Sequence, residues 1–167
     1  LAGVLDLILV SLIARRMGLA RHHMAALLLA TSPFFLLAQT SFQSEVFTLP
    51  AALAGYLALL KARQNPPDGP IFPAFLVGVC SGWIFLGRPL TGVVFATSMA
   101  LGLFLGRGAP RLKGIFGAIL GGLPMLFLAL AYNRAQTGDW FLYPYKSYAG
   151  MFGPWENPGA AAADRIP

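Results

Sequence analysis

The chain has 167 residues, of which 57% are hydrophobic and only 11% are charged. A soluble domain carries roughly 25% charged residues, and disordered chains combine low hydrophobicity with high charge, so both classes are excluded. The net charge of +6 does not indicate a nucleic-acid-binding protein, because the basic residues form short clusters between apolar runs and do not follow one face. The composition therefore predicts an integral membrane protein.

Six apolar runs follow one another along the chain, over residues 1–14, 24–38, 46–60, 71–87, 90–106 and 114–132. One helix over 24–60 would be about 56 Å long, against a hydrocarbon core of about 30 Å, so we expect a turn in the polar stretch 39–45. The same argument requires a turn at Gly87-Arg88-Pro89, where glycine suits a helix end and proline the start of the next helix. Pro33 and Pro124 lie inside runs and are expected to kink them.

These runs predict an all-α fold, a polytopic bundle of about six membrane helices over residues 1–132. The segment 133–167 is rich in Tyr, Trp, Gly and Pro and is expected to lie at the outer face as an aromatic interfacial tail. The glycine pairs 78/82, 102/106 and 117/121 are each spaced four apart, which is typical of closely packed helices.

The distribution of lysine and arginine predicts the orientation in the membrane. Alternate connections between the runs contain most of the basic residues: Arg15, Arg16, Arg21, Lys61, Arg63, Arg107, Arg111 and Lys113. By the positive-inside rule these connections face the cytoplasm, so Glu45, Arg88 and the tail face outward. Within the runs the only charged residue is Asp6.

Two outward residues are candidates for chemistry, and each has a structural alternative. Arg88 can bind a phosphate through two parallel hydrogen bonds, or can extend to lipid headgroups as an interfacial arginine. Glu45 can bind a metal ion or orient a sugar or base. Alternatively, it is a carboxylate at the start of a helix, which Ser44 caps.

Several motifs, in order, resemble the GT-C integral-membrane glycosyltransferases, in particular the protein-O-mannosyltransferase-like and aminoarabinose-transferase-like bacterial group. The first three matching stretches are "LIARR" at 12–16, "SPFF" at 32–35 and "SFQSE" at 41–45. The next is the junction "FLGRP" at 85–89, followed by "YN", "TGD", "PY", "Y" and "FG" between 132 and 153. The resemblance covers about residues 9–158.

This resemblance implies transfer of a sugar from a polyprenyl-phosphate donor to a lipid, glycan or protein acceptor at the outer face of the cytoplasmic membrane. It also implies that a principal catalytic carboxylate lies in a first outer loop, so we expect this chain to be a piece of a longer enzyme. No cofactor is certain; a divalent metal ion is allowed, with Glu45 as its candidate ligand and as a candidate catalytic group. The donor-phosphate site would use Arg88 and Lys146, and the donor groove would use Ser41, Gln43, Asn133, Asp139, Tyr145 and Tyr148.

Two other classes stay open. A lipid flippase or small-molecule transporter would use the same charges along a translocation path, but such a path needs ionisable residues at several depths and the runs are nearly free of them. A non-catalytic membrane scaffold is the third interpretation.

Overall fold

The computed structural model describes residues 2–40, 45–64, 70–105 and 111–142, and these form helices without a strand. The helices are α1 (Ala2–Arg16), α2 (His22–Ala30), α3 (Pro33–Thr40), α4 (Glu45–Gln64), α5 (Phe72–Gly87), α6 (Pro89–Leu105) and α7 (Arg111–Thr137). The all-α class is therefore confirmed for the described part of the chain. The chain divides into two units, Leu1–Leu126 and Phe127–Pro167, and each is described by itself.

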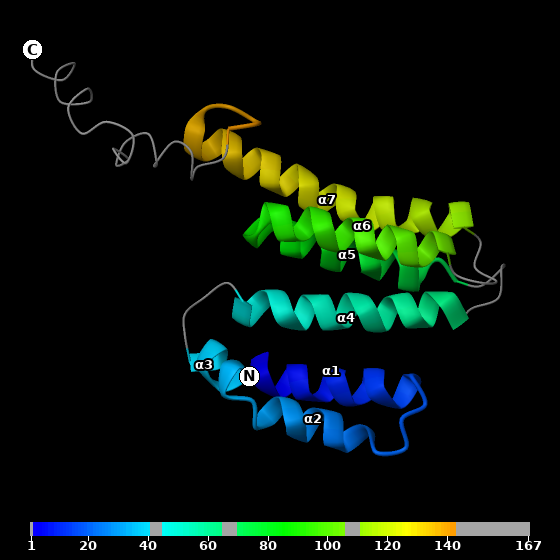
Figure 1. The fold of residues 1–167 in the computed structure, drawn as a ribbon. Coiled ribbons are helices and arrows are strands. Elements are labelled where there is room, and N and C mark those ends of the chain that lie inside the picture. Colours follow the sequence, from blue (N-terminus) through cyan, green and yellow to red (C-terminus); the bar gives the residue numbers. More distant parts are fainter. Residues whose placement is uncertain (1, 41–44, 65–69, 106–110, 143–167) are drawn as a thin grey trace, which may run out of the picture. The chain divides into compact units, whose positions relative to one another are not determined.

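Within the first unit the helices run up and down, with α1 against α2 and α4, and α5 against α4 and α6 (Figure 1). The helices α1, α4 and α6 therefore end at the same end of this unit (Figure 1). Most of the clustered basic residues lie in helix ends and not in the connections, where the sequence predicts them: Arg15 and Arg16 end α1, Lys61 and Arg63 are in the last turn of α4, and Arg111 and Lys113 begin α7.

Prolines and a threonine cap determine two of the helix boundaries. The expected turn at Gly87–Pro89 is confirmed, since α5 ends at Gly87 and α6 begins at Pro89. The run 24–38 is interrupted more strongly than the expected kink: α2 ends at Ala30 and α3 begins at Pro33. The Thr31 hydroxyl donates to the Leu27 carbonyl oxygen at 3.0 Å and completes the end of α2. Proline has no N–H to continue the ladder, so the chain starts a new helix.

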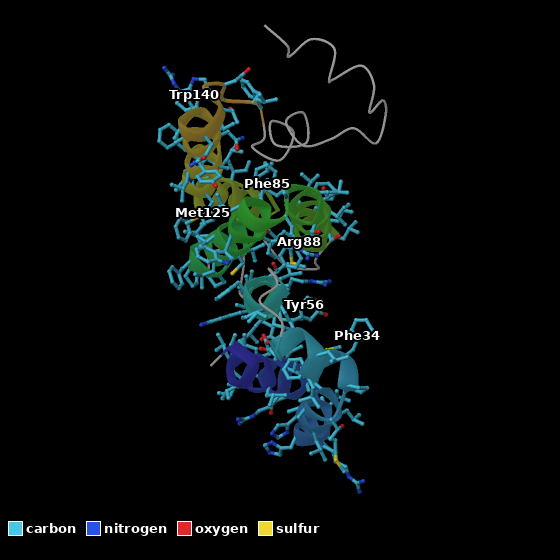
Figure 2. All side chains as sticks on the ribbon, turned by 90° about the vertical axis from the view of Figure 1, so that its left-hand side faces the viewer. Phe34, Tyr56, Phe85, Arg88, Met125 and Trp140 are labelled. Carbon is cyan, nitrogen blue, oxygen red and sulfur yellow. The ribbon has the colours of Figure 1, made fainter. Side chains whose placement is uncertain are left out.

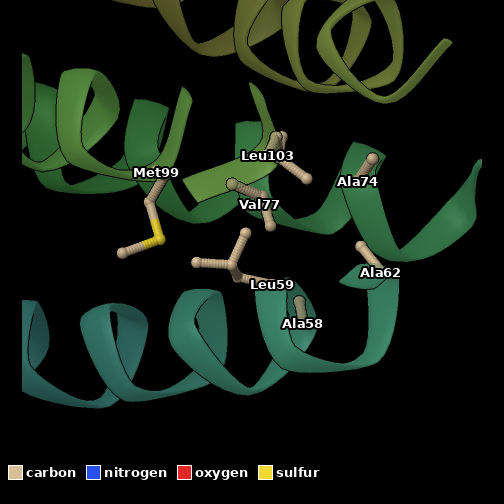
Figure 3. Close-up of a cluster of buried hydrophobic side chains, with 7 residues drawn as sticks. All are labelled: Ala58, Leu59, Ala62, Ala74, Val77, Met99 and Leu103. Carbon is tan, nitrogen blue, oxygen red and sulfur yellow. The ribbon is translucent and has the colours of Figure 1, made fainter. Parts of the chain in front are cut away.

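The core of the first unit lies between α4, α5 and α6 (Figure 3). Its fully or nearly buried members are Ala58, Leu59, Ala62, Ala74, Val77, Met99 and Leu103. Four of the seven are alanine or valine, and such small side chains let the three helices approach closely.

Glycines bring α5 against the first half of α7. A Cβ placed on Gly78 would overlap the Ala118 carbonyl oxygen, and one placed on Gly121 would overlap the Phe75 carbonyl oxygen. The expected role of the pairs 78/82 and 117/121 in helix contacts is therefore confirmed. The two helices touch backbone to backbone, a distance that only glycine permits.

Most large apolar side chains of the described residues are exposed. Leu28 is 72% exposed, Phe34 86% and Leu90 80%. The helices α4 and α7 are long and apolar enough to cross a membrane, and only 22% and 17% of their most apolar stretches are buried within the protein. In the core of a water-soluble protein such helices would be mostly buried. The length and composition of these two helices therefore give weak support for membrane association. The helices α5 and α6, with 16 and 17 residues, are shorter apolar helices.

Candidate functional site

The sharp junction between α5 and α6 fixes the backbone of Arg88. Its N–H donates to the Ile84 carbonyl oxygen, and its own carbonyl oxygen accepts from the Gly92 N–H, both at 2.8 Å. Its φ of −144° and ψ of 88° are extended, because the ring of Pro89 disfavours a helical conformation in the preceding residue. A Cβ on Gly92 would overlap the Phe85 backbone, so the two helices are in contact directly beyond the junction. The side chain of Arg88 therefore starts from a rigid position.

Arg88 lines a cavity of about 450 Å³ in the first unit, hereafter the Arg88 pocket. Figure 2 shows this arginine between the α5–α6 pair and α4. Its other lining residues come from the end of α2, the α2–α3 connection and helices α3, α4 and α6: Leu29, Ser32, Phe34, Phe35, Gln39, Thr48, Leu49, Ala52 and Thr91. The pocket thus combines one cation, three hydroxyl side chains and one amide with an apolar wall. This composition suits a ligand that has an anionic group, hydroxyl groups and an apolar part.

Gln39 connects the Arg88 pocket to a buried carboxylate. Its Nε2 donates to Asp6 Oδ2 at 3.0 Å, and its amide lies against Gly3, where a Cβ would be 3.1 Å from Gln39 Oε1. Asp6 is 0% exposed, and its Oδ1 has no hydrogen-bond partner among the residues that the structure describes. Gly3 and Asp6 are three apart and share one face of α1, so together they receive the Gln39 side chain.

A second cavity, of about 340 Å³, lies between α5, α6 and the first half of α7. Its lining is almost entirely apolar and includes Val77, Phe85, Ala96, Leu103, Ile119 and Leu123. Gly92 and Val93 line this apolar cavity, whereas the preceding Thr91 lines the Arg88 pocket. The two cavities therefore lie on different sides of the first turns of α6.

In the second unit, Asn133 lies near the end of α7 and Asp139 lies two residues beyond it. The Thr137 hydroxyl donates to the Asn133 carbonyl oxygen at 2.8 Å, and Asp139 Oδ1 accepts from the Phe141 N–H at 2.9 Å. Gly138 has a φ of 79° and its N–H donates to the Arg134 carbonyl oxygen, which is the geometry of a glycine that ends a helix. Asn133 is nearly buried, whereas Asp139 is exposed, so of the two only Asp139 is accessible to a ligand.

An arginine and a tryptophan stack at the same end of α7. The Arg134 guanidinium carbon lies 4.7 Å from the centre of the Trp140 ring, and the Asn133 Nδ2 donates to the Trp140 carbonyl oxygen at 3.3 Å. Figure 2 labels Trp140 beyond the last turn of the helix. Arginine over an indole ring is a cation–π pair, and it presents a charge and an aromatic surface together.

The structure describes no side chain for the remaining predicted site residues. Ser41, Gln43, Tyr145, Lys146 and Tyr148 lie outside the described residues. Glu45 is the first residue of α4, where a carboxylate would be stabilised by the helix dipole, and the structure describes its backbone and not its side chain.

A metal site is not assembled by the described residues. No three His, Cys, Asp or Glu side chains in the described ranges lie close enough together to hold an ion.

Sequence reasoning did not select the amide and hydroxyl residues of the Arg88 pocket. Gln39 was expected in a turn between runs, and Ser32, Thr48 and Thr91 were counted within or beside apolar runs. The sequence contained one indication of this region, namely Asp6 as a single charged residue inside an apolar run. Such a residue needs a polar partner, and in the structure that partner is Gln39.

Comparison with known proteins identifies no relative. No family model, no curated protein and no solved structure matches the chain.

Proposed function

We propose that this chain is part of a polytopic, GT-C-type glycosyltransferase of the cytoplasmic membrane. The enzyme would transfer a sugar from a polyprenyl phosphate to a lipid, glycan or protein acceptor at the outer face. One observation carries the proposal: Arg88 has both backbone groups hydrogen-bonded in the α5–α6 junction and lines a pocket of mixed polar and apolar surface.

In this mechanism a base deprotonates the acceptor hydroxyl, the hydroxyl oxygen attacks the anomeric carbon, and the lipid phosphate leaves with the bonding electrons. The resemblance assigns the base to a carboxylate in a first outer loop. Negative charge grows on the departing phosphate, and the guanidinium of Arg88, whose backbone is held by two hydrogen bonds, would stabilise that charge more in the transition state than in the ground state. Lys146 would add a second cation, and Glu45 would orient the donor.

The apolar cavity between α5, α6 and α7 supports a lipid-linked donor. A polyprenyl chain needs an apolar surface next to the site that binds its phosphate. Thr91 of the Arg88 pocket and Gly92 of the apolar cavity are consecutive, so a headgroup and its hydrocarbon chain would lie on either side of the start of α6. Asp139, which is exposed, and the predicted Tyr145 and Tyr148 stay candidate groove residues in this proposal, whereas Asn133 is buried.

A transporter or flippase is the second candidate, and Asp6 is the observation that favours it. A fully buried carboxylate inside an apolar helix is typical of ion and proton pathways. Purified full-length protein in liposomes separates the two functions. A transferase releases polyprenyl phosphate and glycosylates an acceptor, whereas a flippase moves a fluorescent polyprenyl-phosphate sugar between leaflets without consuming it. Leaflet exchange without any sugar transfer would overturn the proposal.

The proposed orientation predicts a labelling pattern. In a Cys80→Ala background, which removes the only cysteine of the sequence, Asp139→Cys should react with a membrane-impermeant maleimide in intact cells. Arg63→Cys, in the last turn of α4, should react only after permeabilisation, since the positive-inside rule places it in the cytoplasm. Both side chains are exposed in the structure, so a lack of reaction reports the membrane side. Reaction at position 63 and not at 139 in intact cells would contradict this orientation.

A further inference from the structure

The contact between Asp6 and Gln39 has a consequence for what the Arg88 pocket can recognise. An amide side chain offers two N–H donors and one carbonyl acceptor. An ionised carboxylate only accepts hydrogen bonds, so a glutamine beside it must turn its nitrogen toward it. The bond from Gln39 Nε2 to Asp6 Oδ2 therefore orients the amide with its nitrogen toward α1.

We infer that Gln39 is a specificity residue of the Arg88 pocket, oriented by Asp6, and that it recognises the hydroxyl groups of a sugar. The inference rests on the proposed function and assigns different groups of the ligand to different residues. Arg88 binds the anionic phosphate, and Gln39, on the α3 wall of the same pocket, binds the polyhydroxylated group attached to it. Asp6 touches no ligand in this scheme and is a positioning residue.

Three observations support these roles for Gln39 and Asp6. Gln39 is one of the residues that line the pocket, and its side-chain amide donates to Asp6. Gly3 leaves space for the amide against α1. Asp6 is completely buried and in contact with Gln39, and a buried carboxylate is costly even with this one hydrogen bond, so we expect it to have a role. Orienting a ligand-binding amide is such a role.

Alternative uses of Asp6 fit less well. A metal site is not supported, because no further metal-binding side chains gather near it in the described ranges. A purely structural clamp between α1 and α3 would need no polar group at all, since apolar contact would serve between two apolar helices.

The test measures binding of two probes to the full-length protein in nanodiscs. Farnesyl phosphate has the anion and the apolar chain and no sugar. A panel of farnesyl-phosphoryl hexoses has all three, and the tightest member is taken as the sugar probe. The readout is the ratio of the two dissociation constants, which a general loss of stability does not change.

Gln39→Leu should weaken the sugar probe roughly three- to tenfold, the value of one neutral hydrogen bond, and leave farnesyl phosphate within about twofold. Asp6→Asn should shift the ratio in the same direction by a smaller factor, because asparagine can both donate and accept and lets the Gln39 amide flip. This isosteric variant keeps the test valid if Gln39→Leu does not fold. Ser98→Ala is the matched control; its hydroxyl bonds the Val94 carbonyl oxygen on exposed α6 surface and the ratio should not move.

The possible failures are distinguishable. If Arg88→Ala changes the affinity for neither probe, the phosphate site and the proposed function are overturned together with this inference. If Arg88→Ala weakens both probes while the Gln39 and Asp6 variants leave the ratio unchanged, the inference alone is overturned.

Discussion

Replacing Arg88 by alanine in the full-length protein should lower the rate of sugar transfer roughly tenfold to a hundredfold. A hydrogen bond to a charged group contributes about 1.5–3 kcal/mol, and each 1.4 kcal/mol is a factor of ten. The loss should appear in kcat and in kcat/KM, because the contact strengthens as the phosphate leaves. The measurement is steady-state transfer from a polyprenyl-phosphate sugar by purified enzyme in nanodiscs.

Two further variants separate this role from that of an interfacial arginine. Arg88→Lys keeps the charge and loses the planar fork, so it should retain part of the activity. Arg63→Ala, which removes an exposed arginine from the far end of α4, is the matched control and should transfer sugar normally. An arginine that only contacts headgroups predicts full replacement by lysine and an Ala variant with normal kinetics, and that result would refute the phosphate role.

Gly78→Ala should destabilise the protein by about 1–3 kcal/mol, the usual cost of overpacking a close contact. The new methyl group would overlap the Ala118 carbonyl oxygen and would lie 2.8 Å from the Gly122 backbone nitrogen. Backbone atoms cannot rotate away as a side chain can, so α5 and α7 must separate. Thermal unfolding in detergent, followed by size-exclusion of the remaining monodisperse protein, measures the change.

Gly114→Ala is the control for this prediction, because it makes the same substitution within α7 without a clash. The nearest atom to its new Cβ would be Leu103 Cδ2 at 3.8 Å, an ordinary van der Waals distance. Alanine has a higher helix propensity than glycine by about 1 kcal/mol, so this variant should be as stable as the parent or more so. Equal effects of the two substitutions would show that the α5–α7 contact is not tight.

The sequence predicts those features of the fold that depend on neighbouring residues. The junction at Arg88 follows from a glycine and a proline on either side of it and from the limited thickness of a membrane. The glycine pairs along α5 and α7 indicated close packing because their spacing places them on one helix face. The six-span bundle itself stays a proposal, since two of the described helices have the length and composition of a span.

The parts of the site that were not predicted depend on contacts between distant segments. Asp6 and Gln39 are 33 residues apart, and nothing in either run indicates that α3 lies across α1. The break before Pro33 was expected only as a kink, because a proline allows either outcome and the Thr31 cap decides it. The hydroxyl residues of the pocket are common in membrane helices, and only the fold shows which of them share a cavity.

The interruption between α2 and α3 also bears on how a ligand enters the Arg88 pocket. Helices of nine and eight residues are too short to be stable by themselves, since isolated helices need roughly 12–15 residues. α3 therefore depends on its neighbours, and its side-chain anchor on α1 is the Gln39 amide. Phe35 of α3 is buried but does not belong to the cluster between α4, α5 and α6, so a local opening of this wall would leave that cluster intact. In the proposed enzyme, opening this wall would break the bond between Gln39 and Asp6 and expose Phe35, and binding of a sugar by Gln39 would hold the wall shut during transfer.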